Sequence, residues 1–170
     1  SPTSKSGAIL MMDGDFSLTH RLEFRDAYIS EVTFPQFDGA SKDAAFLTIG
    51  IAPERTEFKV AGGAGIPAGG RQKRWQASNF RLSIPGLPTE TVSRVDAFTV
   101  RQVFTEERGR MVPMDLEYPN MALTLSEVDS GPWFDYFKEF VLNGNPAGEK
   151  DWLLESLAPD LSVLFQIGFR

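Results

Sequence analysis

Residues 8–24 read Ala-Ile-Leu-Met-Met-Asp-Gly-Asp-Phe-Ser-Leu-Thr-His-Arg-Leu-Glu-Phe. Two strand-like runs, Ala8–Asp13 and Phe16–Phe24, lie on either side of the turn sequence Asp13-Gly14-Asp15. Apolar runs of this length around a turn rich in Gly and Asp are typical of a β-hairpin. The stretch therefore predicts a pair of antiparallel strands.

Several further runs show the same preference for strands. In them apolar and polar residues alternate with a period of two, which is the pattern of a half-buried strand. The predicted strands are Tyr28–Phe34, Phe46–Ile51, Phe80–Ile84, Val92–Phe104 and Met121–Leu125. Strands thus account for most of the regular structure that the sequence predicts.

Only one segment has a helical period. Five apolar residues fall on one helical stripe; they are Trp133, Phe134, Phe137, Phe140 and Val141. We expect a helix over 130–143, with Trp133, Phe137 and Phe140 largely buried and with Asp135 and Lys138 facing water. One helix among strands predicts a mainly β fold of the α+β class.

A glycine-rich stretch divides the chain. Ala61–Gly70 contains five Gly and one Pro and shows no apolar periodicity, which is typical of a flexible linker. We take 61–75 as the linker between residues 1–60 and 76–170. Each part alone has too few strands to bury both faces of a Phe-rich core. We therefore expect the two parts to build one domain together, within a chain or by exchange between chains.

An internal repeat is the most informative feature of the sequence. Asp15–Arg25 aligns with Asp160–Arg170, and the Asp, Ser, Phe and Arg residues match in type. A strand-like apolar run precedes each copy, at Ala8–Met12 and at Trp152–Leu157. Two amphipathic hairpins can look alike by chance. The alternative is a tandem duplication, in which the chain holds the second half of one unit and the first half of the next.

Composition narrows the classes of function. The 170 residues include no cysteine, so disulfides and zinc–thiolate sites are excluded. The net charge of −6 argues against a specific grip on nucleic acid, which needs clustered Lys and Arg. No apolar run is long enough to span a membrane, and we expect a protein made in the cytoplasm.

The candidates for chemistry are isolated. His20 is the only histidine and lies within a predicted strand, Asp38 stands alone, and the adjacent Glu106 and Glu107 would point to opposite faces of a strand. Asp13 and Asp15 are interpreted as turn residues. The basic group before Trp75 is interpreted as the solvated end of the linker; it comprises Arg71, Lys73 and Arg74. We therefore predict no catalytic residue, no metal site and no cofactor.

Several short motifs, in order, resemble the bacteriophage tail-tube family, which includes the inner tubes of contractile tails and related injection systems. The motifs that resemble its opening half are Asn79–Leu87 with Val92–Val95, Glu117–Leu125 and the aromatic helix sequence Trp133–Phe137. Glu31–Asp38, Ala40–Asp43 and Phe46–Glu54 resemble its closing strands. The closing half precedes the opening half here, an order that fits the duplication.

The resemblance implies an antiparallel β-barrel of two packed sheets with one flanking helix. Residues 1–60 would supply its closing half and 76–170 its opening half. It implies a non-catalytic subunit whose partner is itself, in rings of six that stack into a tube, with sheath or baseplate proteins as further partners. Such a subunit would assemble in the cytoplasm and become part of a virion or a phage-tail-like particle.

In the family a long loop reaches a neighbouring subunit, and Thr105–Tyr118 corresponds to it here. The expected contact residues are Arg108, Arg110, Met111, Val112 and Met114. An ordinary surface loop is the open alternative for this segment. For the whole chain, the alternative is a baseplate or terminator adaptor, or another binding module on the same barrel.

Overall fold

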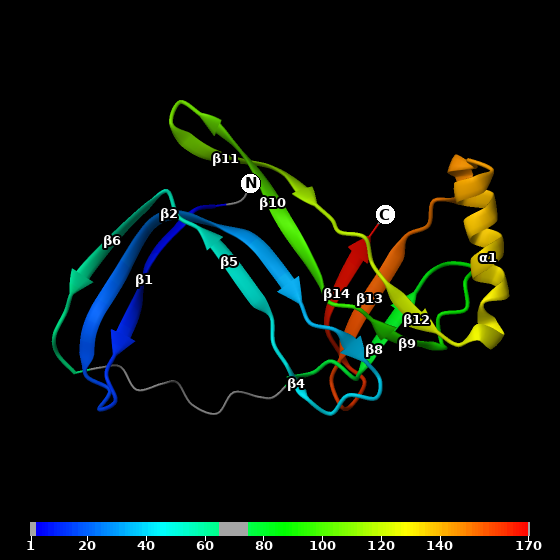
Figure 1. Cartoon of the computed structure of the whole chain (residues 1–170), viewed down its shortest axis with the longest axis horizontal. Helices are drawn as coiled ribbons and strands as arrows, with labels where there is room; N and C mark the ends of the chain where they lie inside the picture. Colours follow the sequence, from blue (N-terminus) through cyan, green and yellow to red (C-terminus); the bar gives the residue numbers. More distant parts are fainter. Residues whose placement is uncertain (1–2, 65–74, 170) are drawn as a thin grey trace. The chain divides into compact units, whose positions relative to one another are not determined.

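The computed structural model describes residues 3–64 and 75–169, of which Figure 1 shows the arrangement along the chain. It is 55% strand and 11% helix, with several antiparallel sheets and one helix. The prediction of a mainly β fold is therefore confirmed. The chain forms two compact units, and each unit combines three separate segments. Unit 1 comprises Ser1–Thr33, Leu47–Lys73 and Thr99–Pro119, and unit 2 comprises Phe34–Phe46, Arg74–Phe98 and Asn120–Arg170.

Unit 1 is built on one six-stranded sheet. Its strands are β1 (Lys5–Met12), β2 (Leu18–Phe34), β5 (Thr48–Ala52), β6 (Arg55–Val60), β10 (Phe98–Glu107) and β11 (Arg110–Glu117). The long strand β2 organises this sheet, because β1 and β6 pair with its first part and β5 with its last part. β10 also neighbours β2, and β11 pairs with β10 in a hairpin (Figure 1).

The described residues of unit 2 form three small sheets and the helix. The sheets have the strand orders β12-β9-β3, β14-β13-β8 and β4-β7. Their strands are β3 (Phe37–Asp38), β4 (Ala44–Ala45), β7 (Trp75–Gln76), β8 (Phe80–Ser83), β9 (Val92–Val95), β12 (Leu123–Leu125), β13 (Trp152–Leu157) and β14 (Val163–Phe169). The helical elements are η1 (Glu127–Asp129), α1 (Gly131–Phe137), η2 (Lys138–Leu142) and η3 (Pro146–Gly148).

The hydrophobic core lies in unit 2. Phe37, Val95 and Leu154 are fully buried, and aromatic rings pack around Phe37 from Trp75 and Phe80. The buried hydroxyl of Ser156 accepts a hydrogen bond from the indole N–H of Trp75 at 2.7 Å. By contrast, Ala27 is the only buried apolar residue among the described residues of unit 1. The two units therefore differ sharply in how much apolar surface they cover.

The predicted helix is present; of its three expected core residues, Trp133 and Phe140 are half-buried and Phe137 is exposed. α1 continues into a single π-helical turn, η2, and Asp135 and Lys138 face solvent as expected. Trp133 is half-buried and donates its indole N–H to the carbonyl of Pro88 at 3.1 Å. Phe137 is 50% exposed, because the face turned toward the sheets carries Trp133, Tyr136 and Phe140 instead.

Three other expectations about local structure need correction. Val92–Phe104 is two strands, β9 and β10, that belong to different sheets. The segment expected as a loop over 105–118 is mostly the β10–β11 hairpin. Within the described residues, no sheet closes into a barrel.

The predicted linker over 61–75 is only partly described. Ala61–Ala64 continues alongside the start of β2, where the N–H of Ala61 donates to the carbonyl of Thr19. Trp75 belongs to β7 and contacts the core of unit 2. Residues 65–74 lie outside the described residues, and so do Arg71, Lys73 and Arg74.

The two copies of the sequence repeat form hairpins with the same register. β1–β2 and β13–β14 pair residue by residue with a constant offset in residue number, and a bulge interrupts both at the same place. The equivalent pairs are Ile9–Leu22 and Leu154–Ile167, Leu10–Arg21 and Glu155–Gln166, Met11–His20 and Ser156–Phe165, and Met12–Leu18 and Leu157–Val163. The similarity in sequence thus extends to the pairing of the strands.

The turns of the two hairpins also agree. In the first, the N–H of Asp13 donates to the carbonyl of Ser17 at 3.0 Å; in the second, the N–H of Ala158 donates to that of Ser162 at 2.8 Å. Ser162 also donates through its hydroxyl to Asp160 at 2.6 Å, and this bond lowers the pKa of the Asp160 carboxyl. Both turns are therefore held by a backbone hydrogen bond at the same position.

Candidate functional site

The first part of the unit 1 sheet, formed by β1, β2 and β6, has one apolar face. Residues directly opposite one another on adjacent strands share a face, and the face alternates from one residue to the next. One set of facing residues is Ile9, Leu22 and Phe58, and the next on the same side is Met11, His20 and Val60. Ile9, Phe58 and Val60 are 48%, 58% and 83% exposed. We call this surface the apolar face.

The last part of the same sheet also exposes apolar side chains. Ile29 of β2 lies directly opposite Ile51 of β5, and beyond a bulge Val32 lies opposite Ile49. Three of these four side chains are exposed; they are Ile29, Ile49 and Ile51. A sheet face of this composition normally packs against another layer of structure.

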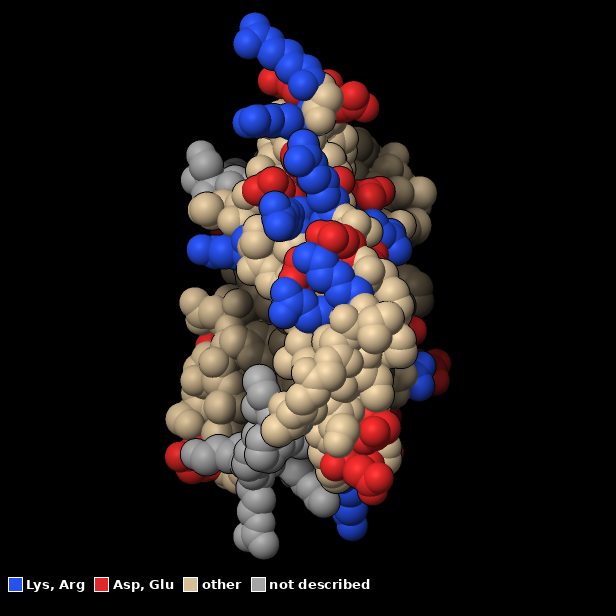
Figure 2. Space-filling model, turned by 90° about the vertical axis from the view of Figure 1, so that its left-hand side faces the viewer, with Lys and Arg blue, Asp and Glu red and all other residues tan. Residues whose placement is uncertain are grey.

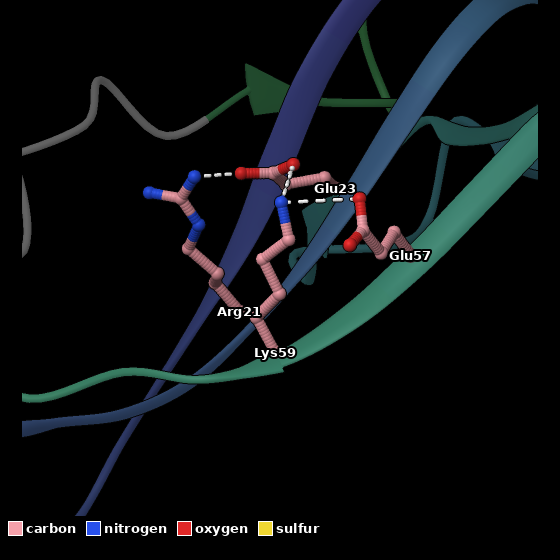
Figure 3. A network of polar contacts seen from close by, with 4 residues as sticks. All are labelled: Arg21, Glu23, Glu57 and Lys59. Atoms are coloured by element: carbon pink, nitrogen blue, oxygen red, sulfur yellow. Dashed lines mark hydrogen bonds and ion pairs between the residues drawn. The ribbon is translucent and has the colours of Figure 1, made fainter.

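The opposite face of β2 and β6 is charged (Figure 3). Glu23 and Glu57 face each other across the strands. Lys59 contacts both carboxylates, at 2.8 and 3.0 Å, and Arg21 forms an ion pair with Glu23. In this part of the sheet β2 and β6 are thus amphipathic, with their charged side chains on one face and their apolar side chains on the other.

A pair of arginines lies two residues farther along the charged face of β2 and β6. Arg25 and Arg55 are directly opposite each other, an arrangement of like charges that destabilises a pair of strands. Glu23 and Glu57 are already engaged by Arg21 and Lys59. Figure 2, which faces the left-hand side of Figure 1, shows Lys and Arg side chains gathered in its upper part, with acidic side chains between them.

Four of the five predicted contact residues lie together, near these arginines. Arg108, Arg110, Met111 and Val112 line a cleft of about 660 Å³ in unit 1, together with Arg55 and others. Glu54 holds the hairpin at this point, because its carboxylate accepts the N–H of Met111 at 3.0 Å. Met114 lies outside this cleft and is 66% exposed.

The tip of the β10–β11 hairpin is a tight turn of two residues. Arg108 and Gly109 both have positive φ, 52° and 74°. Glycine adopts this conformation readily, whereas an arginine does so at some cost. The turn presents the Arg108 side chain to solvent.

The candidate chemical residues have local structural roles. The ring of His20 stacks on that of Phe58, with 5.2 Å between the centroids. A carboxylate oxygen of Asp38 accepts the N–H of Ala40 at 2.9 Å within a turn. Glu106 is exposed on β10, where it pairs with Met111. In the described part of the chain, no three His, Asp or Glu residues are grouped so as to hold a metal ion.

Sequence reasoning missed two features of this surface. β6 was not predicted, although Arg-Thr-Glu-Phe-Lys-Val at 55–60 alternates charged and apolar residues over its last four positions. The pairing of Arg25 with Arg55 depends on the register between β2 and β6 and has no signal in the sequence.

No family model matches this sequence, and neither a curated protein nor a solved structure gives a significant match. Among the described residues there is no helix with the length and apolar character needed to cross a membrane.

Proposed function

We propose that this chain is a non-catalytic structural subunit that assembles with copies of itself, of the tail-tube type found in phages and contractile injection systems. The observation that carries the proposal is the uncovered apolar face of unit 1. A single-layer sheet with almost no buried apolar residue of its own gains stability when another surface covers it.

The fold expected for this family suggests what covers the apolar face. The family resemblance implies a barrel of two packed sheets, and we propose that a neighbouring copy supplies the second layer for the apolar face. Head-to-tail contacts of this kind close into rings when the rotation between copies allows it. Rings of six copies would stack into a tube, which sheath or baseplate proteins would contact. Assembly would take place in the cytoplasm, before the subunit becomes part of a virion or tail-like particle.

The β10–β11 hairpin is the proposed second contact between copies. Met114 is the most exposed apolar residue of the predicted contact set, and a flexible Met side chain adapts to varied partner surfaces. Arg108 and Arg110 are exposed in the same hairpin. In a neighbouring copy, whose net charge is also −6, they would meet acidic groups.

The proposal is tested by light scattering after size-exclusion chromatography over a range of concentrations. Phe58 and Glu57 are adjacent, exposed residues of β6 on opposite faces of the sheet. We expect the unsubstituted protein to assemble, Phe58→Ser to weaken its assembly, and Glu57→Ser to leave it nearly unchanged. Circular dichroism checks that both variants fold.

Two results would count against the proposal. An unsubstituted protein that stays monomeric at high concentration would favour the adaptor alternative, a baseplate or terminator component with one specific contact surface. Equal effects of Phe58→Ser and Glu57→Ser would remove the apolar face from the assembly contact.

A further inference from the structure

The outer edge of β1 carries no strand in the described part of the chain. β1 stands at the end of its sheet and pairs with β2 on one side only. An unpaired strand edge presents a row of backbone N–H and C=O groups, which readily pair with another extended segment. The repeat indicates which segment fits this edge.

β13 is the strand equivalent to β1 in the second hairpin, and both of its edges are paired. β14 occupies one edge, as β2 does for β1, and β8 occupies the other. On that second edge Leu82 lies opposite Leu154, and Phe80 lies opposite Ser156. Through the shared register, Leu154 is equivalent to Ile9 and Ser156 to Met11. Among residues 3–64 and 75–169, the edge of β1 therefore lacks the strand that its counterpart has.

The two copies of the hairpin also differ in burial, and the copy without β8 beside it is the more exposed. Leu154 and Ser156 are fully buried, whereas their equivalents Ile9 and Met11 are 48% and 37% exposed. The covered copy has β8 beside it, together with Trp75, which bonds to Ser156. The uncovered copy has the same hairpin, and no described residue forms a third strand on this side.

We propose that the outer edge of β1 binds an extended polypeptide strand with the pattern of β8. The strand runs antiparallel to β1, with a leucine-like residue opposite Ile9 and an aromatic residue opposite Met11. Backbone hydrogen bonds hold the added strand, and its alternate side chains select the register. The β8 of the same chain is not this strand, because it pairs with β13.

The inference goes beyond the proposed tube and does not depend on it. A monomeric adaptor would bind the strand equally well, and a tube held by other surfaces would leave the edge of β1 open. Failure of one proposal is thus distinguishable from failure of the other.

The register can be tested by disulfide capture, because the protein has no cysteine. The probe is a synthetic peptide of residues 78–85, Ser-Asn-Phe-Arg-Leu-Ser-Ile-Pro, in which the residue corresponding to Ser83 is cysteine. The proposed register places this residue opposite Ala8, since Ser83 lies opposite Leu153 on β13. The full-length Ala8→Cys variant is oxidised with the peptide, and the product is measured by mass spectrometry.

Two matched variants control for position. Leu10→Cys lies two residues along the same edge, about 7 Å away, which is beyond ordinary disulfide reach from the expected position. Leu153→Cys reports a peptide that displaces β8 from β13. We expect capture by Ala8→Cys to exceed capture by either control roughly tenfold or more, since disulfide geometry is strict.

Each alternative outcome overturns the proposal. Equal capture by Ala8→Cys and Leu10→Cys would mean that the peptide contacts β1 without a fixed register. Capture mainly by Leu153→Cys would mean that the peptide recognises only the β13 edge. No capture by Ala8→Cys in a variant that folds normally would mean that the edge of β1 does not accept this strand.

Discussion

Phe16 and Leu161 adopt the same left-handed backbone conformation at equivalent positions of the two hairpins, with φ of 58° and 65°. Bulky residues rarely occupy this region, because the side chain crowds the following carbonyl. Each residue is nevertheless held there by the backbone hydrogen bonds that close its turn, to the carbonyls of Asp13 and Ala158. The same uncommon conformation therefore recurs with the register of the strands.

Leu161→Gly and Phe16→Gly are expected to stabilise the protein or leave it unchanged, despite the loss of a large side chain. Both side chains are mostly exposed, so little packing is lost. The relief of left-handed strain, about 1–2 kcal/mol, outweighs the greater flexibility of glycine in the unfolded chain, about 0.5–1 kcal/mol. Denaturant melts measure the difference. Val163→Gly, in the adjoining strand, is the control and should destabilise; equal losses in all three would contradict the argument.

Ser156→Ala should destabilise the protein by about 1–3 kcal/mol, because it leaves the indole N–H of Trp75 without its partner in a part-buried site. Ser93→Ala is the matched control, since the hydroxyl of Ser93 also takes part in a hydrogen bond, here as the donor to the carbonyl of Thr124, but Ser93 is exposed. Thermal or urea unfolding gives both values. Similar small losses in the two variants would show that water replaces the lost bond at Trp75.

Substitutions on the helix should separate its two apolar faces. Trp133→Ala removes a half-buried ring and the bond to Pro88, and should approach the usual cost of about 3–5 kcal/mol for a core aromatic residue. Phe134→Ala should cost less than about 0.5 kcal/mol, as is usual at the surface, because that side chain is 69% exposed. Urea unfolding measures both. A large loss for Phe134→Ala would mean that another surface covers this side of the helix.

Arg55→Glu should stabilise the pair of strands β2 and β6 by about 0.2–1 kcal/mol, since it turns a facing pair of like charges into opposite charges. The gain should shrink in high salt, which screens exposed charges. Arg101→Glu is the control, because Arg101 is paired with Glu31 at 3.3 Å and its reversal should destabilise. A destabilising Arg55→Glu at low salt would show that the two arginines do not repel each other across the strands.

The sequence predicted the strand content because period-two alternation reports a half-buried strand wherever it is long enough to read. It predicted the hairpins of the repeat for the same reason. It did not predict that Val92–Phe104 divides between two sheets, because the break at Asp96-Ala97 depends on which neighbours each part pairs with. The contact residues were assigned to a loop, although Arg108-Gly109 is a turn between two strands that pair with each other.

Burial along the helix was harder to predict. Apolar residues lie on both sides of α1 and η2, so the spacing alone did not indicate which side faces the sheets. The choice depends on contacts from distant segments, such as the packing of Trp133 on Trp152 and of Lys150 over the ring of Tyr136. The helical period of the apolar residues identifies the stripes that they form, whereas contacts with distant segments determine which stripe is buried.

Unit 2 combines three segments that are far apart in the sequence, and this affects how it forms during biosynthesis. Phe37, at the centre of the core, leaves the ribosome well before Leu154, which completes the same core from the far end of the sequence. Phe37 lacks its complete surroundings until Leu154 has been made, whereas the last segment of unit 1 is already complete at Pro119. Contacts between residues so far apart in sequence form slowly. The nascent chain therefore carries an aromatic segment without its complete core until Leu154 has been made, and chaperones that hold such segments would act on residues 34–46.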